Sequence, residues 1–221
     1  MTKKKFEKPE GKEHLDKDFL EELKHKIWST KGTRFTADSR LKSTSKLSQL
    51  CIGLLSVYLI IFGLLTVYKI YNPEDNNATA NILAFSITAT SIILLVFTLF
   101  ENSQDYEIRA KNFHDCALDL ADLYNELQTF KTYKKDASDD DKMNFAKDLQ
   151  KRYQTVLRKY DNHAPIDNKR FKSQHMDYYK NLNWKFKLWT NIKYFYQTKL
   201  IYLSAIIIPG VILYYLVQDV A

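Results

Sequence analysis

One short segment of the chain combines residue types that could do chemistry. In KYDNHAPIDNKR, residues 159–170, His163 lies between Asp161 and Asp167. An imidazole near two carboxylates could act as an acid–base pair or supply part of a metal site. The segment offers no further ligand or nucleophile, and the chain contains neither a glycine-rich phosphate loop nor a Cys/His cluster. We therefore expect no catalytic residue, no metal and no cofactor, and keep a catalytic or metal-binding loop as the alternative.

The same segment is typical of a turn between two helices. Pro165 disfavours a helical conformation at Ala164, so a helix has to end before it. Asn162 and His163 suit the C-terminal end of the first helix, where a cationic imidazole favours the helix dipole. Asp167 suits the N-cap of the next helix, because its carboxylate can accept hydrogen bonds from free backbone N–H groups. The turn interpretation gives each of these residues a structural role.

The elements that must position this turn include three long apolar segments. Mean hydropathy is slightly negative, yet the apolar residues are concentrated in residues 47–70, 78–100 and 200–217. A helix of about 20 apolar residues crosses the bilayer core of about 30 Å. The first two segments are long enough, whereas the third is shorter and contains Pro209. We predict a transmembrane hairpin over residues 47–100 and a third transmembrane helix over 200–217.

The distribution of basic residues predicts the orientation of the hairpin. Residues 1–49 contain 13 Lys and Arg, residues 101–199 contain 19, and the loop 71–80 contains none. Basic residues stay on the cytoplasmic side of a membrane. The N-terminal segment 1–46 and the helical region 101–199 are therefore expected in the cytoplasm. The charged start of the chain does not resemble a signal peptide, whose apolar region begins close to the N-terminus.

The net charge of +7 raises the question of which anionic partner the protein contacts. Acidic residues are mixed with the basic ones throughout the chain, which favours a solvated helical surface that faces anionic membrane lipid. Direct binding of nucleic acid is not expected.

Apolar periodicity predicts helices throughout the cytoplasmic parts. Residues 18–28 fit a helix, and residues 106–130 and 146–160 carry apolar side chains at steps of three and four. A further helix over 171–196 could continue into the third apolar segment, with a kink at Pro209. No segment shows convincing strand alternation. The predicted fold class is all-α: a transmembrane helical hairpin, a cytoplasmic helical bundle and a third C-terminal transmembrane helix.

Two short motifs, in a fixed order around the hairpin, resemble the sequence pattern of a known family. The first is WSTKGTRFTADSRLK before the first span, and the second is LRKYDNHAPIDN after the second. Together they are similar to the fifth subfamily of the SLATT family, over roughly residues 18–189. Six residues are candidates for a structural motif within this pattern: Arg34, Arg40, Tyr160, Asn162, His163 and Asp167.

The resemblance implies a function that composition does not show. SLATT domains are two-transmembrane effectors associated with nucleotide-second-messenger and ligand-sensing modules in prokaryotic conflict systems. The resemblance thus implies a homo-oligomer in the inner membrane that opens a pore, or otherwise breaches the membrane, when infection is sensed. It also implies a nucleotide-second-messenger or reverse-transcriptase defence partner. The third apolar segment goes beyond the two spans of the family name.

A stripe of small and polar residues marks one face of the second span. The steps between its members are three, four, three and seven, which keeps them on one side of a helix. A fainter stripe follows the first span. The candidate pore-lining or helix-packing residues are Asn81, Ala84, Thr88, Ser91 and Thr98 in the second span, with Gly53, Ser56 and Gly63 in the first. Small residues allow close helix approach, so the stripes predict either packing of the two spans or an oligomer contact and pore lining.

Basic residues before the first span have two interpretations. Arg34 and Arg40 could anchor the protein at the membrane interface, with their charged heads near the lipid head groups. Alternatively, they could bind an anionic activator or pair with Asp167 or Asp161 across the cytoplasmic bundle.

The function that the resemblance implies is that of a toxic membrane effector that oligomerises and permeabilises the membrane. Two other classes stay open. A small channel or transporter would need charged or discontinuous spans, for which only Pro209-Gly210 gives a hint. A membrane-tethered interaction scaffold of a defence complex would use the cytoplasmic helices as its working part. An enzyme is the class that the sequence favours least.

Overall fold

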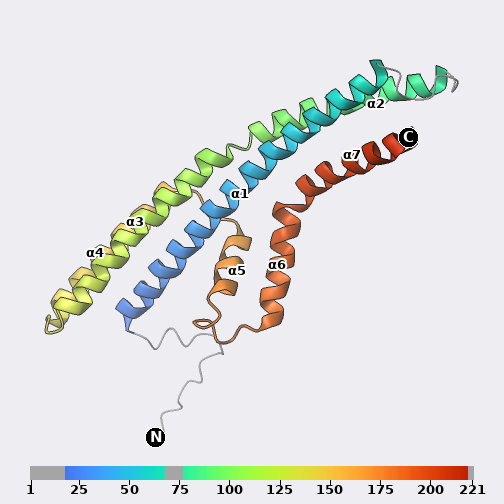
Figure 1. Ribbon diagram of the computed structural model, residues 1–221. Coiled ribbons are helices and arrows are strands. Elements are labelled where there is room, and N and C mark those ends of the chain that lie inside the picture. Colours follow the sequence, from blue (N-terminus) through green and yellow to red (C-terminus); the bar gives the residue numbers. More distant parts are fainter. Residues whose placement is uncertain (1–17, 68–76, 219–221) are drawn as a thin grey trace, which may run out of the picture. The chain divides into compact units, whose positions relative to one another are not determined.

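The computed structural model describes residues 18–67 and 77–218, without the side chains of residues 77–83, 213 and 216–218. Its elements are helices, and the described residues contain no strand, which confirms the all-α prediction (Figure 1). In chain order the helices are α1 (Phe19–Val67), α2 (Asn77–Asn102), α3 (Tyr106–Tyr133), α4 (Asp139–Lys159), α5 (Pro165–Gln174), α6 (Trp184–Thr198) and α7 (Leu200–Gln218).

The chain divides into two compact units. The bundle unit comprises Met1–Asp38 and Lys111–Tyr178, and the membrane unit comprises Ser39–Ala110 and Tyr179–Ala221. Helix α1 is continuous over 49 residues and contributes to both units. The predicted helix over residues 18–28 is therefore the beginning of the helix that carries the first span.

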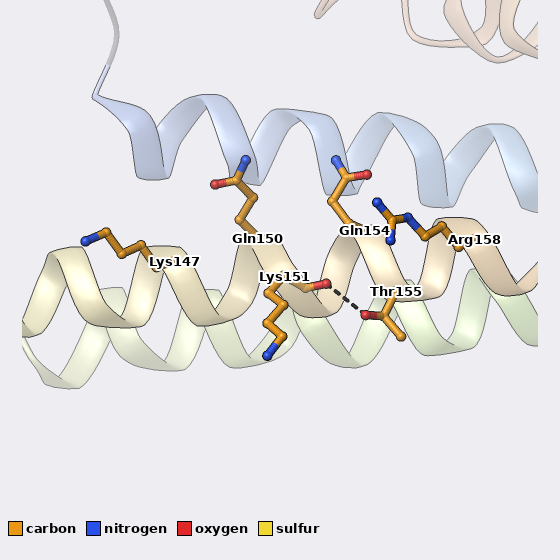
Figure 2. A pocket seen from close by; sticks show the side chains of 6 residues that line it. All are labelled: Lys147, Gln150, Lys151, Gln154, Thr155 and Arg158. Atoms are coloured by element: carbon orange, nitrogen blue, oxygen red, sulfur yellow. Dashed lines mark hydrogen bonds between the residues drawn. The ribbon is translucent and has the colours of Figure 1, made fainter.

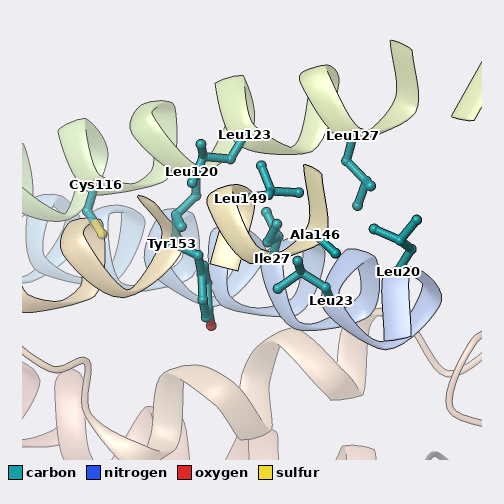
Figure 3. Packing of buried hydrophobic residues seen from close by; sticks show 10 residues of the cluster. All are labelled: Leu20, Leu23, Ile27, Cys116, Leu120, Leu123, Leu127, Ala146, Leu149 and Tyr153. Carbon is teal, nitrogen blue, oxygen red and sulfur yellow. The ribbon is translucent and has the colours of Figure 1, made fainter. Parts of the chain in front are cut away.

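The bundle unit has a core formed by one face each of α1, α3 and α4 (Figure 3). Steps of three and four bring its members to the same side of each helix. Burial of each large aliphatic side chain stabilises the fold by roughly 1.5–3 kcal/mol. The buried members are Leu20, Leu23 and Ile27 of α1, Cys116, Leu120, Leu123 and Leu127 of α3, and Ala146, Leu149 and Tyr153 of α4.

The membrane unit contains the apolar segments. Two helical stretches, Phe19–Val67 and Ala84–Tyr133, are long and apolar enough to cross a membrane, and α6 with α7 forms a bent pair that could be a third span. Most large apolar side chains of α2 are exposed, for example Phe85, Ile93 and Leu99. Helices that expose such side chains along their length are typical of a membrane protein, where lipid covers them.

The helix that leads into the third apolar segment differs from the prediction. The helix expected over 171–196 is interrupted between α5 and α6, where the Asn183 side chain caps α6 by accepting a hydrogen bond from the Phe186 N–H (3.0 Å). Pro209 lies inside α7, which continues past it to Gln218. The axis bends by 60° between α6 and α7, at Lys199. The bend lies where the lysine-containing, aromatic sequence of α6 gives way to the uncharged α7.

Helix α7 follows α1 in the same direction. The Cys51 thiol of α1 donates to the carbonyl of Tyr202 (3.8 Å), and further along both helices Tyr58 lies opposite Gly210. A Cβ atom at Gly210 would lie 3.0 Å from the Tyr58 hydroxyl oxygen, so glycine permits this approach. Because both contacts occur in the same chain order, the two helices run parallel.

Tyr202 also joins α7 to the junction of α2 and α3. Its hydroxyl donates to a carboxylate oxygen of Glu101 (2.8 Å) and lies 3.2 Å from the Tyr106 hydroxyl. The side chain is buried, so these partners satisfy a polar group that would otherwise be costly to bury. Between Glu101 and Tyr106, Asp105 adopts a left-handed backbone conformation (φ 49°), and this turn separates α2 from α3.

Candidate functional site

Arg34 is the centre of a polar cluster in the bundle unit. It lies on α1 and is only 1% exposed. Its guanidinium donates to the carbonyl of Asp161, in the turn after α4, and lies 5.3 Å from the centre of the Phe113 ring. The carbonyls at a helix C-terminus lack partners within the helix, so a cation there is favourable. Interfacial anchoring is therefore the wrong interpretation for Arg34, because its side chain is enclosed by protein.

The turn between α4 and α5 agrees with the prediction that Ala164 is not helical, but Asp167 is not the N-cap that the sequence predicts. Ala164 has an extended backbone conformation and Pro165 is the first residue of α5. Asp167 is therefore the third residue of the helix, not its N-cap, and its buried carboxylate accepts a hydrogen bond from the Ala164 N–H (3.1 Å). The start lies earlier than predicted because proline suits the first helical position, where its missing N–H costs nothing.

His163 lies in this turn between the charges of Arg34 and Asp167. Burial lowers the pKa of its imidazole below the usual range, the positive charge of Arg34 lowers it further, and Asp167 opposes both. The side chain is therefore neutral at pH 7. Its Nδ1 atom is buried and has no hydrogen-bond partner in the described part of the chain. This environment suits a packed structural residue.

Two further residues of the cluster were missed by sequence reasoning. Asp38 lies one turn after Arg34 on α1, and its carboxylate is 3.4 Å from Nδ1 of His114 on α3. The His114 ring also packs edge-on against Phe35 (5.6 Å between ring centres). The spacing of Arg34 and Asp38 puts both on one side of α1 and was available from the sequence, but their partner on α3 was not.

The remaining motif residues have separate positions. The Tyr160 hydroxyl donates to a carboxylate oxygen of Asp119 on α3 (2.9 Å), and burial raises the pKa of its phenol. Asn162 is exposed. Arg40 belongs to the membrane unit, so the structure does not place it in this cluster.

Aromatic side chains of α5 and the residues after it pack against Trp28 of α1. Trp28 packs against Phe171, His175 and Tyr178, with ring centres 4.7–5.4 Å apart. One turn after Trp28, Gly32 faces the same Phe171 ring, and a Cβ atom at this position would overlap that ring. Glycine is thus required for the approach of α5, which explains the WSTKG sequence within the first motif.

The polar stripe of α2 is exposed in the described structure. Ala84, Thr88 and Ser91 are exposed and Thr98 is half-buried, while the side chain of Asn81 lies outside the described residues. The Thr88 hydroxyl donates to the Ala84 carbonyl (2.9 Å) and the Ser91 hydroxyl to the Ile87 carbonyl (2.7 Å). Both hydroxyls are thus satisfied within their own helix. Whether the stripe packs helices or lines a pore stays a prediction.

The stripe of α1 is similarly open. Gly53 is exposed, and Gly63 and Ser56 are half-buried. A Cβ atom at either glycine would meet nothing within 4 Å. The Ser56 hydroxyl donates to the Ile52 carbonyl of its own helix (2.9 Å). These glycines are not needed for packing within the described chain.

The cluster around Arg34 connects helices through hydrogen bonds and an ion-pair contact. Within the part of the chain that the structure describes, no group of three or more His, Cys, Asp and Glu side chains could hold a metal ion. Arg34 and Asp167 hold backbone groups of the turn, and Asp38 faces His114. The geometry thus ties α1, α3 and the α4–α5 turn together.

Comparison with known families accounts for nearly the whole chain. The sequence model of SMODS and SLOG-associating 2TM effector domain family 5 matches residues 16–216. Neither the curated proteins nor the solved structures give a match. The family match includes both motifs, the hairpin and most of α7. The chain belongs to SMODS and SLOG-associating 2TM effector domain family 5, which is the SLATT subfamily that its motifs resemble.

Proposed function

We propose that the protein is a membrane effector of a prokaryotic conflict system, which oligomerises and permeabilises the inner membrane on activation. Growth arrest or cell death is the consequence. The N-terminus lies in the cytoplasm, and activation depends on a nucleotide-second-messenger or reverse-transcriptase defence partner. The protein does its work through assembly and not through enzymatic catalysis.

The observation that supports this proposal most directly is the exposure of the polar stripe on α2. Ala84, Thr88 and Ser91 are exposed, and no residue among those described covers them. In a membrane, a face of small and hydroxyl-bearing residues allows another helix to approach closely. Since the partner is not supplied by the described part of the same chain, a second copy is the natural occupant.

The number of spans supports assembly of several copies. The chain has two candidate spans, or three if α6 and α7 together form one. A helix with its side chains is about 10 Å across, so two or three helices pack against one another and leave no channel between them. A pore therefore requires spans from several copies around it.

Helix α1 offers a route by which activation could reach the membrane. It is unbroken from Phe19 to Val67, and its N-terminal part carries the Arg34 cluster and the contacts with Phe171. A partner that shifts these contacts would act on the helix that carries the first span. In this scheme the cluster is a coupling element and the stripe is the working face.

The proposal is tested by replacing stripe residues in the full chain, expressed with its activating partner. Thr88→Leu and Ser91→Leu should reduce killing and uptake of a membrane-impermeant dye, while membrane insertion and protein level stay normal. Val96→Leu is the matched control on an exposed apolar position of the same helix, and it should kill fully. Full killing and dye uptake by both stripe variants would contradict the pore.

A further inference from the structure

The outer face of α4 carries positive charges that no acidic side chain of the described structure neutralises. Lys147, Lys151 and Arg158 are exposed and line a shallow hollow together with Gln150, Gln154 and Thr155 (Figure 2). No acidic residue contributes to its lining. We call these six residues the basic face.

Other cations of the same helix are paired. Arg152 forms ion pairs with Glu126 of α3 and with Asp148, and the Lys159 ammonium lies 3.3 Å from an Asp119 carboxylate oxygen. Among the described residues, the three cations of the basic face have no such ion pair. The cations of α4 that are near α3 are thus paired with carboxylates, whereas the cations of the basic face are not.

The beginning of α4 carries the opposite charge. Asp139, Asp140 and Asp141 begin the helix, and Asp136 lies in the turn before it; all four are exposed, and we call them the acidic end. Two of these aspartates have partners within the chain: Asp141 hydrogen-bonds with the capping Ser138, and a carboxylate oxygen of Asp139 lies 3.7 Å from the Lys142 ammonium. Asp136 and Asp140 have no ion pair within the described residues.

The acidic end and the basic face lie along the same side of the helix. From Asp140 to Lys147, Lys151 and Arg158 the steps are seven, four and seven residues, or two turns, one turn and two turns. One exposed face is therefore acidic at its start and basic over the rest of its length. Such a face is complementary to a second copy of itself when the copies are offset.

We infer that the basic face of α4 binds the acidic end of α4 from a second copy of the chain. This inference rests on the proposed assembly of several copies and adds the contact that would join them in the bundle unit. Asp136 and Asp140 of one copy contact Lys147, Lys151 and Arg158 of the next. Exposed opposite charges at such a contact steer association and select its register.

The order of the charges decides the symmetry of the contact. In a two-fold antiparallel pairing that sets Asp140 against Arg158, Lys147 of each helix faces Lys151 of the other. Like charges directly opposite each other are unfavourable. An offset, head-to-tail contact avoids this, because each acidic end lies against the basic face of the next copy. Contacts of this heterologous kind join copies into rings when the rotation closes.

The test uses charge reversal in the full chain, in membranes. The basic-face variant carries Lys147→Glu, Lys151→Glu and Arg158→Glu, and the acidic-end variant carries Asp136→Lys and Asp140→Lys. The readout is the yield of cross-linked dimers and larger species with a carbodiimide, which joins a carboxylate to an amine in contact. Each variant alone should lose at least about tenfold of the yield, since like charges then meet at the contact.

Recombination of the variants distinguishes a contact between copies from any other effect of charge. Co-expressed with different tags, the two variants present complementary charges only to each other, so they should cross-link in alternation. A chain that carries all five substitutions should cross-link with itself again. Wild-type yield should fall as salt is added. The control variant reverses three other exposed lysines, Lys111, Lys169 and Lys180, and should cross-link like the wild type.

Three results would overturn the inference. They are unchanged cross-linking of the basic-face variant, failure of the mixed variants to cross-link, and equal loss in the control. Binding of the basic face to anionic lipid vesicles, without any effect on cross-linking, would likewise assign the face to lipid. Dye uptake in the same cells is scored separately: restored cross-linking without dye uptake would refute the pore and leave the contact standing.

Discussion

Arg34 on α1 donates a hydrogen bond to the carbonyl of Asp161, which lies 127 residues further along the chain. The contact joins the two motifs that flank the hairpin in sequence. It gives the buried guanidinium a partner and at the same time satisfies a carbonyl beyond the end of α4. The family motif around Asp161 thus works as one half of a junction whose other half precedes the first span.

Arg34→Met should destabilise the bundle unit by about 1.5–3 kcal/mol, because it removes the hydrogen bond from the buried guanidinium to the Asp161 carbonyl. The loss is measured from the midpoint of denaturant unfolding in detergent. Proteolysis should also become faster in the turn between α4 and α5. Lys169→Met, at an exposed position of α5, is the control and should leave both quantities unchanged. Equal stability of the two variants would show that the Arg34 contact contributes little.

The lowered pKa of His163 predicts a loss of stability in mild acid. In the unfolded chain the imidazole titrates near its usual pKa of about 6.5, whereas the folded protein resists protonation down to a lower pH. Between those two pKa values the unfolded state binds more protons. The free energy of unfolding should therefore fall as pH decreases below about 6.5, by up to about 1.4 kcal/mol per pH unit, and level off below the folded pKa.

The contribution of His163 is isolated by comparing the wild type with His163→Gln, which cannot titrate. The difference in unfolding free energy between the two proteins should be constant above pH 7 and should change as the pH falls below 6.5. A difference that is independent of pH would mean that His163 is as easily protonated in the folded protein as in the unfolded chain.

Gly32→Ala should destabilise the bundle unit by about 1–3 kcal/mol, because the added methyl group would overlap the Phe171 ring. Phe171→Leu in the same chain should recover part of this loss, since it removes the ring that the methyl group meets. The measurement is a double-mutant cycle by denaturant unfolding.

Gly53→Ala is the matched control, because its Cβ atom would meet nothing within 4 Å. In the middle of a helix this replacement should be neutral or stabilising by up to about 1 kcal/mol. If Gly32→Ala behaves like Gly53→Ala, then α5 can move away from α1 at little cost.

The parallel course of α1 and α7 predicts that the C-terminal ends of both helices lie on the same side of the membrane, which the distribution of basic residues predicts to be the outside. Tyr202 and Gly210 of α7 meet Cys51 and Tyr58 of α1 in the same order. A C-terminal tag should therefore be accessible from outside the inner membrane, while a cysteine at Lys135 should be labelled only after that membrane is permeabilised. Equal protection of both sites would contradict the predicted topology of α7. Asp75, in the loop predicted to lie outside, is not among the described residues.

The sequence was sufficient for the helical class and the helix faces of the core. The apolar residues of α3 and α4 recur at steps of three and four, and these same residues, such as Leu120 and Leu149, are buried. Periodicity succeeds here because a helix has a fixed geometry, so spacing along the chain determines which residues share a face. The long uncharged segments predicted spans for a similar reason, since the thickness of the bilayer sets a length.

Helix boundaries were less predictable, because neighbouring residues can favour different start or end positions for the same helix. One continuous helix was expected to lead into the third apolar segment, yet the axis bends by 60° between α6 and α7, at Lys199. Asp167 was expected to cap α5, but Pro165 occupies the first position of that helix and Asp167 binds the Ala164 N–H from the third. In both cases the sequence contained the relevant residues, and their neighbours decided which role each took.

Only the tertiary structure decided what the motif residues contact. Sequence reasoning considered Asp161 and Asp167 as partners of Arg34, and the structure shows that the atom which accepts its hydrogen bond is the backbone carbonyl of Asp161. Every residue has such a carbonyl, so no side-chain pattern could single it out. The pairing of Asp38 with His114 and the approach of Phe171 to Gly32 likewise join distant parts of the chain. By itself the sequence determined which faces α3 and α4 bury, because that follows from local geometry. The partners across the bundle depend on how the helices pack, which is a property of the whole fold.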